Sequence, residues 1–238
     1  MNVSIIIPLL NESDSLRELN SWISKSFKNR GLQYEVIYID DGSNDSSWNI
    51  IKGIAKSNLN IKGISFNRNY GKSQALRVGF SEAKGEYVAT LDADLQDSPE
   101  EIPIMINKLI ESNLDMISGW KKKRYDSFFL KRLPSLLFNF VARIFSGIRL
   151  NDFNCGIKVY KKEVIKSINL YADMHRFIPI LAKNEGYNKI GEHIVKHQPR
   201  KYGKSKFGNE RFIRGFLDII TLWFTNRFGR RPMHFFGS

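Results

Sequence analysis

Three aspartates stand close together in the stretch TLDADLQDSPE, which begins at Thr90. Asp92, Asp94 and Asp97 fall within six positions, although like charges this close repel and carboxylates are rarely buried without partners. On an extended segment residues i and i+2 point to the same side, so Asp92 and Asp94 can present their carboxylates together. Mg²⁺ and Mn²⁺ prefer oxygen ligands, and Mg²⁺ commonly takes one or two carboxylates plus substrate phosphates. The pair is therefore suited to a metal–diphosphate complex.

The D-x-D pattern and the other residues that could do chemistry also have alternative interpretations. The D-x-D pattern alone fits an aspartate-rich turn equally well, with Ser98 as a helix N-cap before Pro99. Gly71–Ser73 is not the end of a P-loop, because that motif requires glycine at the position of Phe66. Cys155 is interpreted as a small packing residue. Four histidines lack zinc-site spacing and are interpreted as surface or hydrogen-bonded residues: His175, His193, His197 and His234.

The elements that must position these residues can be recognised from the spacing of apolar residues, which alternates along the chain between a strand pattern and a helix pattern. Apolar runs typical of buried strands are followed by segments with helical spacing. Such alternation indicates βαβ units and a mainly parallel sheet flanked by helices. We predict strands over 3–7, 34–39, 61–66, 86–91 and 114–119, a strand-like run at 157–160, and helices over 14–28, 46–57, 72–83, 99–112 and 175–186.

Parallel sheets bind ligands at the carboxyl ends of their strands. Four polar segments lie directly after predicted strands, and we expect them to meet along one edge of the sheet. They are Asn11–Glu12, Asp40–Asp41, Asn67–Gly71 and Asp92–Asp94.

The net charge of +13 is divided unevenly between the two halves of the chain. Residues 1–118 carry 12 Lys+Arg and 16 Asp+Glu, a balance of −4, so residues 119–238 carry 25 and 8, a balance of +17. The second half is expected to face something anionic, which leaves nucleic acid, a phosphate-bearing ligand or an anionic membrane open. A merely solvated basic surface is the remaining alternative.

Composition narrows the class of protein further. An apolar content of 42% over 238 residues allows a proper core, and a single cysteine allows no internal disulfide, which favours a reducing, cytosolic-side setting. The N-terminus has no basic start and is not a signal peptide. No segment reaches the ~18–20 uninterrupted apolar residues of a membrane span. The nearest, Phe128–Phe145 and Phe212–Phe224, mix apolar and charged residues and are typical of interfacial or core helices.

Seven ordered blocks give the chain a resemblance that covers nearly its whole length. SIIIPLLNE, VIYIDDGSNDSS, FNRNYGKSQALRVGF and ATLDADLQDSPE resemble family 2 glycosyltransferases of the GT-A fold. NDFNCGIKVY, MHRFIPILAKNEGY and VKHQPRKYGKSKFG resemble the polyprenyl-phosphate sugar transferases, the group that includes dolichol-phosphate mannosyltransferase. This resemblance implies an inverting transfer from a UDP- or GDP-hexose to an undecaprenyl or dolichyl phosphate, with Mg²⁺ or Mn²⁺ as cofactor.

The resemblance also implies roles for individual residues. The donor nucleotide and sugar would be held by Pro8, Asn11, Glu12, Asp41, Lys72, Asp92, Gln96, Tyr202 and Ser205. The metal would be held by Asp92, Asp94 and Gln96. Arg200 to Lys206 match a mobile loop that closes on the donor, and the catalytic set would be Asp94, Asp152, Arg200 and Lys206. The acceptor phosphate would be bound by Arg124, Lys131, Arg132 and Ser135.

Some of these roles have plain structural alternatives. Asp152 lies near the place of catalytic or acceptor-orienting carboxylates in the family, but it also suits a turn or a helix cap. If Phe128–Phe145 is helical, Lys131 and Ser135 share a face at i and i+4. They would equally suit a basic membrane-facing surface without a specific phosphate contact.

The C-terminal part departs from the family. Many members of this group continue into transmembrane helices, whereas this chain stops at RRPMHFFGS. We expect a GT-A catalytic domain over 1–210 and an amphipathic juxtamembrane segment over 211–238, either as a short form or as a truncated chain, at the cytoplasmic face of the membrane. Packing of 212–224 on the domain is the alternative, which Asp218 favours.

Two other functions were weighed against this one. The first is a family 2 transferase that acts on a soluble glycan or polysaccharide, which the basic, aromatic second half argues against. The second is a nucleic-acid-binding protein, which would leave the acidic strand-end edge unexplained, so no nucleic-acid partner is expected. The sequence also leaves open whether the protein forms an oligomer.

Overall fold

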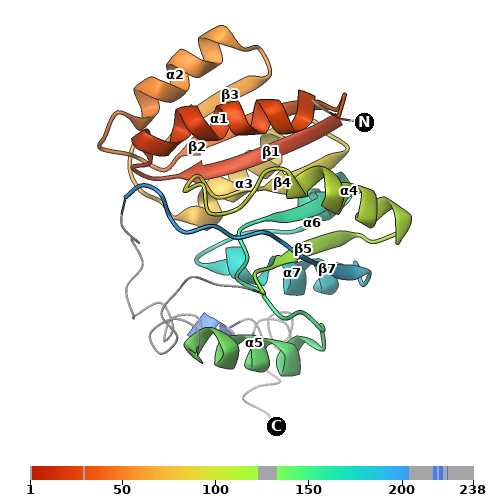
Figure 1. Ribbon diagram of the computed structural model, residues 1–238. Helices are drawn as coiled ribbons and strands as arrows, with labels where there is room; N and C mark the ends of the chain where they lie inside the picture. The colour runs from red at the N-terminus through yellow and green to blue at the C-terminus, as the bar shows by residue number, and fades with distance from the viewer. Residues whose placement is uncertain are drawn as a thin grey trace.

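The computed structural model describes residues 2–28, 30–122 and 133–203, and also residues 217, 218, 220, 221 and 224. The described chain alternates strands and helices up to β5 (Figure 1). The elements are β1 (Asn2–Leu9), α1 (Ser13–Lys28), β2 (Gln33–Asp40), α2 (Ser47–Ser57), β3 (Ile61–Ser65), α3 (Lys72–Glu82), β4 (Tyr87–Thr90), α4 (Glu101–Glu111), β5 (Met116–Trp120), α5 (Leu133–Ser146), β6 (Lys158–Lys161), α6 (Lys162–Ser167), η2 (Met174–Phe177), α7 (Ile178–Asn184) and β7 (Ile190–Ile194).

The strands form one seven-stranded sheet in the order β3-β2-β1-β4-β6-β5-β7. Neighbours pair in parallel except β6, which runs antiparallel to both β4 and β5. The other six strands therefore end at the same edge, and the predicted mainly parallel sheet is confirmed. Because β1 pairs with both β2 and β4, the loops that follow these three strands are neighbours.

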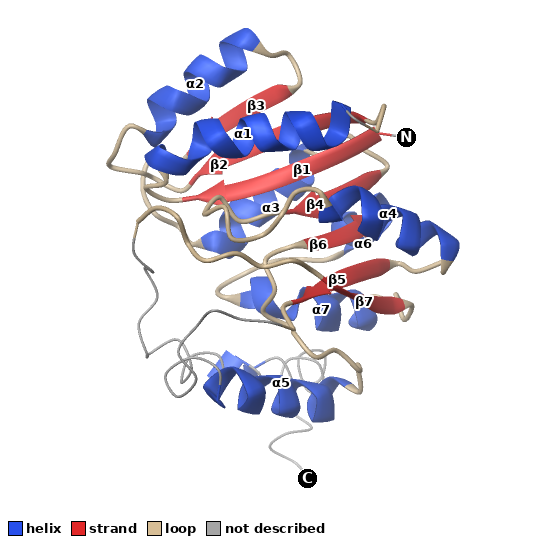
Figure 2. Ribbon diagram, viewed as in Figure 1, coloured by secondary structure: helices blue, strands red, loops and turns tan. Residues whose placement is uncertain are grey.

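Helices cover both faces of this sheet (Figure 2). Ile5 and Ile7 of β1 face a core made with α1, α2 and α4, and Ile6 between them faces a second core made with α3, α5, α6, η2 and α7. A strand that is buried on both faces is apolar at nearly every position, which explains the run VSIII that predicts β1. Its polar residue, Ser4, is buried and donates its hydroxyl to the Glu35 carboxylate. Two apolar layers thus hold the sheet rigid beneath the loops at its carboxyl edge.

The structure adds elements that the sequence pattern does not predict. β7 has the sequence IGEHI, which lacks both an apolar run and strict alternation, because it is the edge strand and is only partly buried. Gly191 has a packing reason in this strand, since a Cβ there would clash with the Leu114 side chain. α6 was not predicted either, and the helix predicted over 175–186 is a 3₁₀ turn followed by the shorter α7.

The structure tests the predictions for the C-terminal part of the chain only in part, because it describes few of the residues there. Among the described residues, no helix combines the length and the apolarity needed to cross a bilayer. Most of 211–238 lies outside the described residues, and so does the predicted boundary at 210, so the two-part division of the chain stays a prediction. The described residues there are helical, and the Thr221 hydroxyl donates to the Leu217 carbonyl at 2.9 Å, one turn back.

Candidate active site

The loop after β4 carries the two aspartates of the D-x-D pattern. β4 ends at Thr90, whose hydroxyl donates to the Gly156 carbonyl at 2.8 Å. The chain then turns tightly at Leu95, which has a left-handed φ of 61°, and the Gln96 amide donates to Asp94 Oδ1 at 3.1 Å. A non-glycine residue in this region of φ is uncommon and strained, and such residues cluster at functional sites. The turn holds both carboxylates at the carboxyl edge of the sheet.

Each carboxylate of the pair is met by a cation from another element. Lys72 Nζ, at the start of α3, lies 2.5 Å from Asp92 Oδ1, and Arg200 Nη2 lies 2.5 Å from Asp94 Oδ2. Arg200 Nη1 also lies 3.5 Å from Glu12 Oε1, in the loop after β1. These side chains remain 13–31% exposed, so the site is partly open to solvent. This edge of the sheet therefore holds three acidic groups and two basic groups, and each aspartate of the pair contacts one of the basic groups.

The electrostatics distinguish the two aspartates. Burial and the nearby charge of Asp92 raise the pKa of Asp94. Burial also opposes ionisation of Asp92, but the charges of Lys72, Lys121 and Lys158 outweigh it and hold the pKa of that carboxyl well below its ordinary range. Asp92 is thus firmly ionised, and Asp94 is a carboxylate that additional positive charge would stabilise.

Gly156 fixes the place of the Asp92 carboxylate. A Cβ built at Gly156 would lie 2.6 Å from Asp92 Cγ, closer than real Cβ contacts allow. This glycine therefore leaves room for the carboxylate against the backbone. The sequence signal was the NDFNCG block that ends at Gly156, but neither spacing nor composition showed which residue fills the space.

The loops after β1 and β2 are joined by a set of hydrogen bonds. The Asn11 amide donates to Ser43 Oγ at 2.8 Å, and Asn11 Oδ1 accepts from the Asn44 amide at 2.8 Å. The Glu12 amide donates to Ser47 Oγ at 2.9 Å. Asn11 has a left-handed φ of 51°, the second strained position at this edge. The predicted meeting of Asn11–Glu12 with the polar turn after β2 is confirmed.

Asp41 joins the turn after β2 to the loop after β3. Its two oxygens accept the amides of Tyr70 at 2.7 Å and Gly71 at 2.9 Å. Gly71, with φ +93°, leads directly into Lys72 and α3. The neighbouring Gly42 packs against this loop, where an added Cβ would lie 2.5 Å from the Arg68 carbonyl carbon. Asp41 therefore shapes the loop that presents Lys72, while a direct contact to the nucleotide stays a prediction, as it does for the buried Pro8 in β1.

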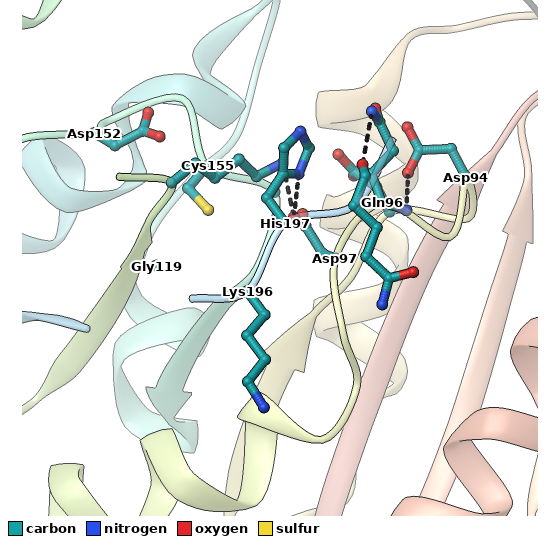
Figure 3. Close-up of polar contacts among 12 residues, drawn as sticks. Asp94, Gln96, Asp97, Gly119, Asp152, Cys155, Lys196 and His197 are labelled. Atoms are coloured by element: carbon teal, nitrogen blue, oxygen red, sulfur yellow. Dashed lines mark hydrogen bonds and ion pairs between the residues drawn. The ribbon is translucent and has the colours of Figure 1, made fainter. Parts of the chain in front are cut away.

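Residues 195–203 form a strap that leaves β7 and crosses the D-x-D loop. The Gln198 amide donates to the Gln96 carbonyl at 2.8 Å, and Gln96 Nε2 lies 3.4 Å from the Gln198 carbonyl. Arg200 then reaches Asp94, and Figure 3 shows Asp94, Gln96, Asp97 and His197 gathered at this crossing. Farther along, Lys201 and Tyr202 both contact Glu18 of α1, at 2.8 Å and 3.1 Å. Gln96 is thus brought to the site, and its side chain faces the strap.

A buried ion cluster lies beneath this crossing. Asp97, which is 1% exposed, lies 2.8 Å from Lys121 Nζ and 3.5 Å from His197 Nδ1. Burial opposes ionisation of Asp97, but Lys121 and His197 lower its pKa overall, and the pKa of Lys121 is correspondingly raised. Asp97 stands out in the sequence as one of three crowded aspartates, but the sequence shows no role for Asp97 or for Lys121. Only the tertiary structure pairs them.

Asp152 lies apart from the aspartate pair. Figure 3 shows it on the far side of Cys155 and His197 from Asp94. Its amide donates to Glu192 Oε1 at 3.0 Å, its Oδ1 accepts the Asn154 amide at 3.1 Å, and the residue is 1% exposed. This is the geometry of a turn-forming aspartate, which was the structural alternative. A catalytic role stays a prediction.

Cys155 has the packing role expected of it. The side chain is buried, and burial raises the pKa of its thiol to about 12, so the thiolate needed for nucleophilic chemistry is absent at neutral pH. Beside it, the Lys158 ammonium donates to the Cys155 carbonyl, and burial lowers the pKa of Lys158.

Several predicted site residues lie outside the described part of the chain. They are Arg124, Lys131, Arg132, Ser205 and Lys206. Ser135 lies in the first turn of α5. Their roles in binding the acceptor or closing on the donor stay predictions.

The residues present fit a divalent metal bound together with a diphosphate. The donor set is two carboxylates, Asp92 and Asp94, each already near a cation, and oxygen ligands of this kind suit Mg²⁺ or Mn²⁺. No group of three or more His, Cys, Asp or Glu able to hold a metal occurs among the described residues. Two carboxylates alone are an incomplete coordination shell, so the substrate's phosphates would have to complete it.

Comparison with known proteins places this geometry in a family. Residues 4–168 match Glycosyl transferase family 2. The chain belongs to that family. This glycosyltransferase is 35% identical to a dodecaprenyl-phosphate galacturonate synthase of Rhizobium johnstonii, over all of the chain and 71% of the relative. It is 39% identical to an undecaprenyl-phosphate 4-deoxy-4-formamido-L-arabinose transferase of Shewanella sediminis, over 92% of the chain and 66% of the relative. The resemblance to the polyprenyl-phosphate sugar transferases is confirmed.

Solved structures support the fold of this glycosyltransferase. Glucosyl-3-phosphoglycerate synthase from Mycobacterium tuberculosis, crystallised with Mn²⁺, UDP and phosphoglyceric acid, superposes with a TM-score of 0.65 at 19% identity, over 92% of this chain and 78% of that one. The same enzyme with phosphoglyceric acid alone gives a TM-score of 0.66 at 18% identity, over 94% and 79%. The predicted GT-A fold is confirmed.

Proposed function

We propose that this glycosyltransferase moves a hexose from a nucleotide-diphosphate sugar to a polyprenyl phosphate at the cytoplasmic surface of a membrane, with inversion and with Mg²⁺ or Mn²⁺. The observation that carries the proposal is the set of ion pairs Asp92–Lys72 and Asp94–Arg200 at the carboxyl edge of the sheet. The two relatives above are named for polyprenyl-phosphate acceptors, and a structural neighbour was crystallised with Mn²⁺ and UDP.

The charged groups have complementary tasks in such a reaction. Asp92 and Asp94 would hold the metal, which when bound neutralises charge that grows on the departing diphosphate. Lys72 and Arg200 supply two further positive charges at the same place, and each already lies on one carboxylate of the pair. Fixed charges aimed at a leaving group stabilise the transition state without reorganisation. The site thus favours loss of a nucleoside diphosphate.

The transfer itself needs no proton to be removed. An oxygen of the acceptor phosphate forms the new bond to the anomeric carbon, and the bond from that carbon to the donor diphosphate breaks, with its electron pair leaving on the nucleotide. Attack opposite the leaving group inverts the configuration. Because the acceptor is already an anion at neutral pH, positioning matters more than base catalysis.

The proposal is tested with purified protein, polyprenyl phosphate in detergent, and a panel of UDP- and GDP-sugars. Nucleotide release and lipid-linked sugar are measured with Mg²⁺ or Mn²⁺ and then with chelator. We expect turnover of one donor that depends on both metal and lipid. Turnover that continues in chelator would contradict the predicted metal requirement. Transfer of the sugar only to a soluble glycan would contradict the predicted polyprenyl-phosphate acceptor.

An exposed apolar face on α5 supports a membrane location. α5 packs on the second core through Phe138 and Ala142, while five large apolar side chains on it remain 51–65% exposed. A helix with one buried and one exposed apolar side, in a half of the chain with a charge of +17, suits an anionic lipid surface. The five are Leu136, Leu137, Phe140, Ile144 and Phe145.

Replacing Phe140 and Ile144 with serine should weaken membrane binding. These residues lie one turn apart on the exposed face, and each loses apolar area that the interface would bury, so we expect at least about a tenfold loss of partitioning onto phosphatidylglycerol vesicles. Sedimentation with the vesicles measures it. Leu59→Ser is the control, because Leu59 is fully exposed between α2 and β3 and should have no effect. Equal partitioning of the double variant and the wild type would place the membrane contact elsewhere.

Changing Lys131 and Arg132 to alanine together should affect the lipid more than the donor. The loss of two positive charges weakens binding of an anionic phosphate head group, so we expect the apparent KM for polyprenyl phosphate to rise about tenfold while that for the nucleotide sugar changes little. Steady-state kinetics with each substrate varied separately measure the difference. An equal rise for both substrates would move the acceptor site away from these residues.

A further inference from the structure

The strap over residues 195–203 is held at its crossing by more than its contact to Asp94. His197 and Asp97 form an antiparallel β-bridge, and the adjacent Gln198 amide donates to the Gln96 carbonyl at 2.8 Å. Upstream, the Val195 amide donates to the Trp120 carbonyl at 3.1 Å. The strap therefore lies in one register against both the D-x-D loop and the end of β5.

Side chains lock this register from below. The His197 side chain is 3% exposed, and its Nδ1 lies 3.5 Å from Asp97 Oδ1. Lys121, the residue that follows β5, places its Nζ 2.8 Å from the same oxygen. One of the dashed lines in Figure 3 joins His197 to Asp97. Three residues from three separate segments thus meet in one buried cluster. Asp97 is the shared partner of the other two, so its removal would leave the buried Lys121 ammonium without its counter-ion.

The cluster lies only three residues before Arg200 in the strap and three residues after Asp94 in the loop. Between the cluster and the Arg200–Asp94 contact at 2.5 Å, the strap and the loop are joined by the hydrogen bond from the Gln198 amide to the Gln96 carbonyl. A change of register at the cluster would move the guanidinium away from Asp94 and Glu12.

We propose that Asp97, Lys121 and His197 are positioning residues which, by holding the strap in register on the D-x-D loop, place Arg200 for the donor diphosphate. The role of Arg200 toward the diphosphate rests on the proposed function. The hold of the cluster on the strap does not, and it can be measured without a substrate.

Three substitutions at His197 separate position from size. His197→Ala removes the contact. His197→Asn keeps a donor near the place of Nδ1, and His197→Gln fills the space but carries its donor near the place of Nε2. His193→Ala is the matched control, because His193 on β7 makes a comparable contact, from its Nε2 to Glu101 at 3.2 Å. Glu101 stays in this variant and keeps its contact to the Lys196 amide at 3.4 Å.

The first measurement is trypsin cleavage at Arg200 and Lys201 in the ligand-free protein, mapped by mass spectrometry. We expect His197→Ala and His197→Gln to be cut at least about tenfold faster than wild type, because the strap is released, and His197→Asn and His193→Ala to stay within about threefold. Cleavage of His197→Ala at the wild-type rate in a protein with an unchanged melting temperature would overturn the inference. Faster cleavage of His197→Asn equal to that of His197→Ala would also overturn it.

The second measurement is calorimetric binding of Mn²⁺–UDP and of Mn²⁺–GDP in a double-mutant cycle. We expect His197→Ala to weaken binding of whichever nucleotide the wild type binds by about tenfold, but by less than about twofold in an Arg200→Ala background, because its effect passes through Arg200. An equal loss in both backgrounds would show a merely structural role and refute the positioning. Binding of neither nucleotide by the wild type would reject the proposed function, while the cleavage result would still decide on the strap.

Discussion

Asp94→Asn should reduce kcat by about 10²–10³-fold while the protein stays folded. The change removes one of the two carboxylates proposed for the metal and leaves Arg200 without its 2.5 Å partner. Because burial and the charge of Asp92 raise the pKa of Asp94, a neutral side chain there also relieves repulsion within the loop. The melting temperature is therefore expected to stay within a few degrees of wild type.

This result is measured by turnover at saturating metal and by thermal unfolding of the same preparation. Asp14→Asn is the control, since Asp14 is an exposed carboxylate in the first turn of α1, and it should keep full activity. Wild-type turnover of Asp94→Asn would remove Asp94 from the metal site. A large fall in melting temperature would instead make Asp94 a structural residue.

Gly156→Ala should reduce donor binding at least about tenfold through a single added methyl group. The new Cβ would lie 2.6 Å from Asp92 Cγ, so the carboxylate must move away from its place beside Lys72. The atom that it meets is the end of a side chain, which can shift without unfolding the sheet. The loss is therefore expected in metal and nucleotide affinity more than in stability.

Calorimetric titration of Mn²⁺ with UDP or GDP measures the affinity of this variant. Gly53→Ala is the matched control, because Gly53 lies within α2 with open space around it and alanine favours a helix there. Gly53→Ala should bind normally and be slightly more stable. If Gly156→Ala also binds normally, Asp92 is not held where the metal would need it.

The sequence by itself determined the class of fold. β1 and β2 are apolar at consecutive positions because both of their faces are buried, and this pattern can be recognised without any long-range information. The rule that parallel strands bind ligands at their carboxyl ends then placed Asn11, Asp41 and Asp92 on one edge before any contact was known. The ordered blocks added the family, which the comparisons confirm.

Only the tertiary structure decided the partners of these residues. β7 lacks a local signal because it is stabilised by pairing with β5, and it is β7 that carries the strap to the D-x-D loop. The contacts of Asp97 with Lys121 and His197 join residues 24 and 100 positions apart (121 − 97 and 197 − 97). Local propensity holds no information about such pairs. They form when the sheet brings separate loops together, and its strand order differs from the order of the strands in the sequence.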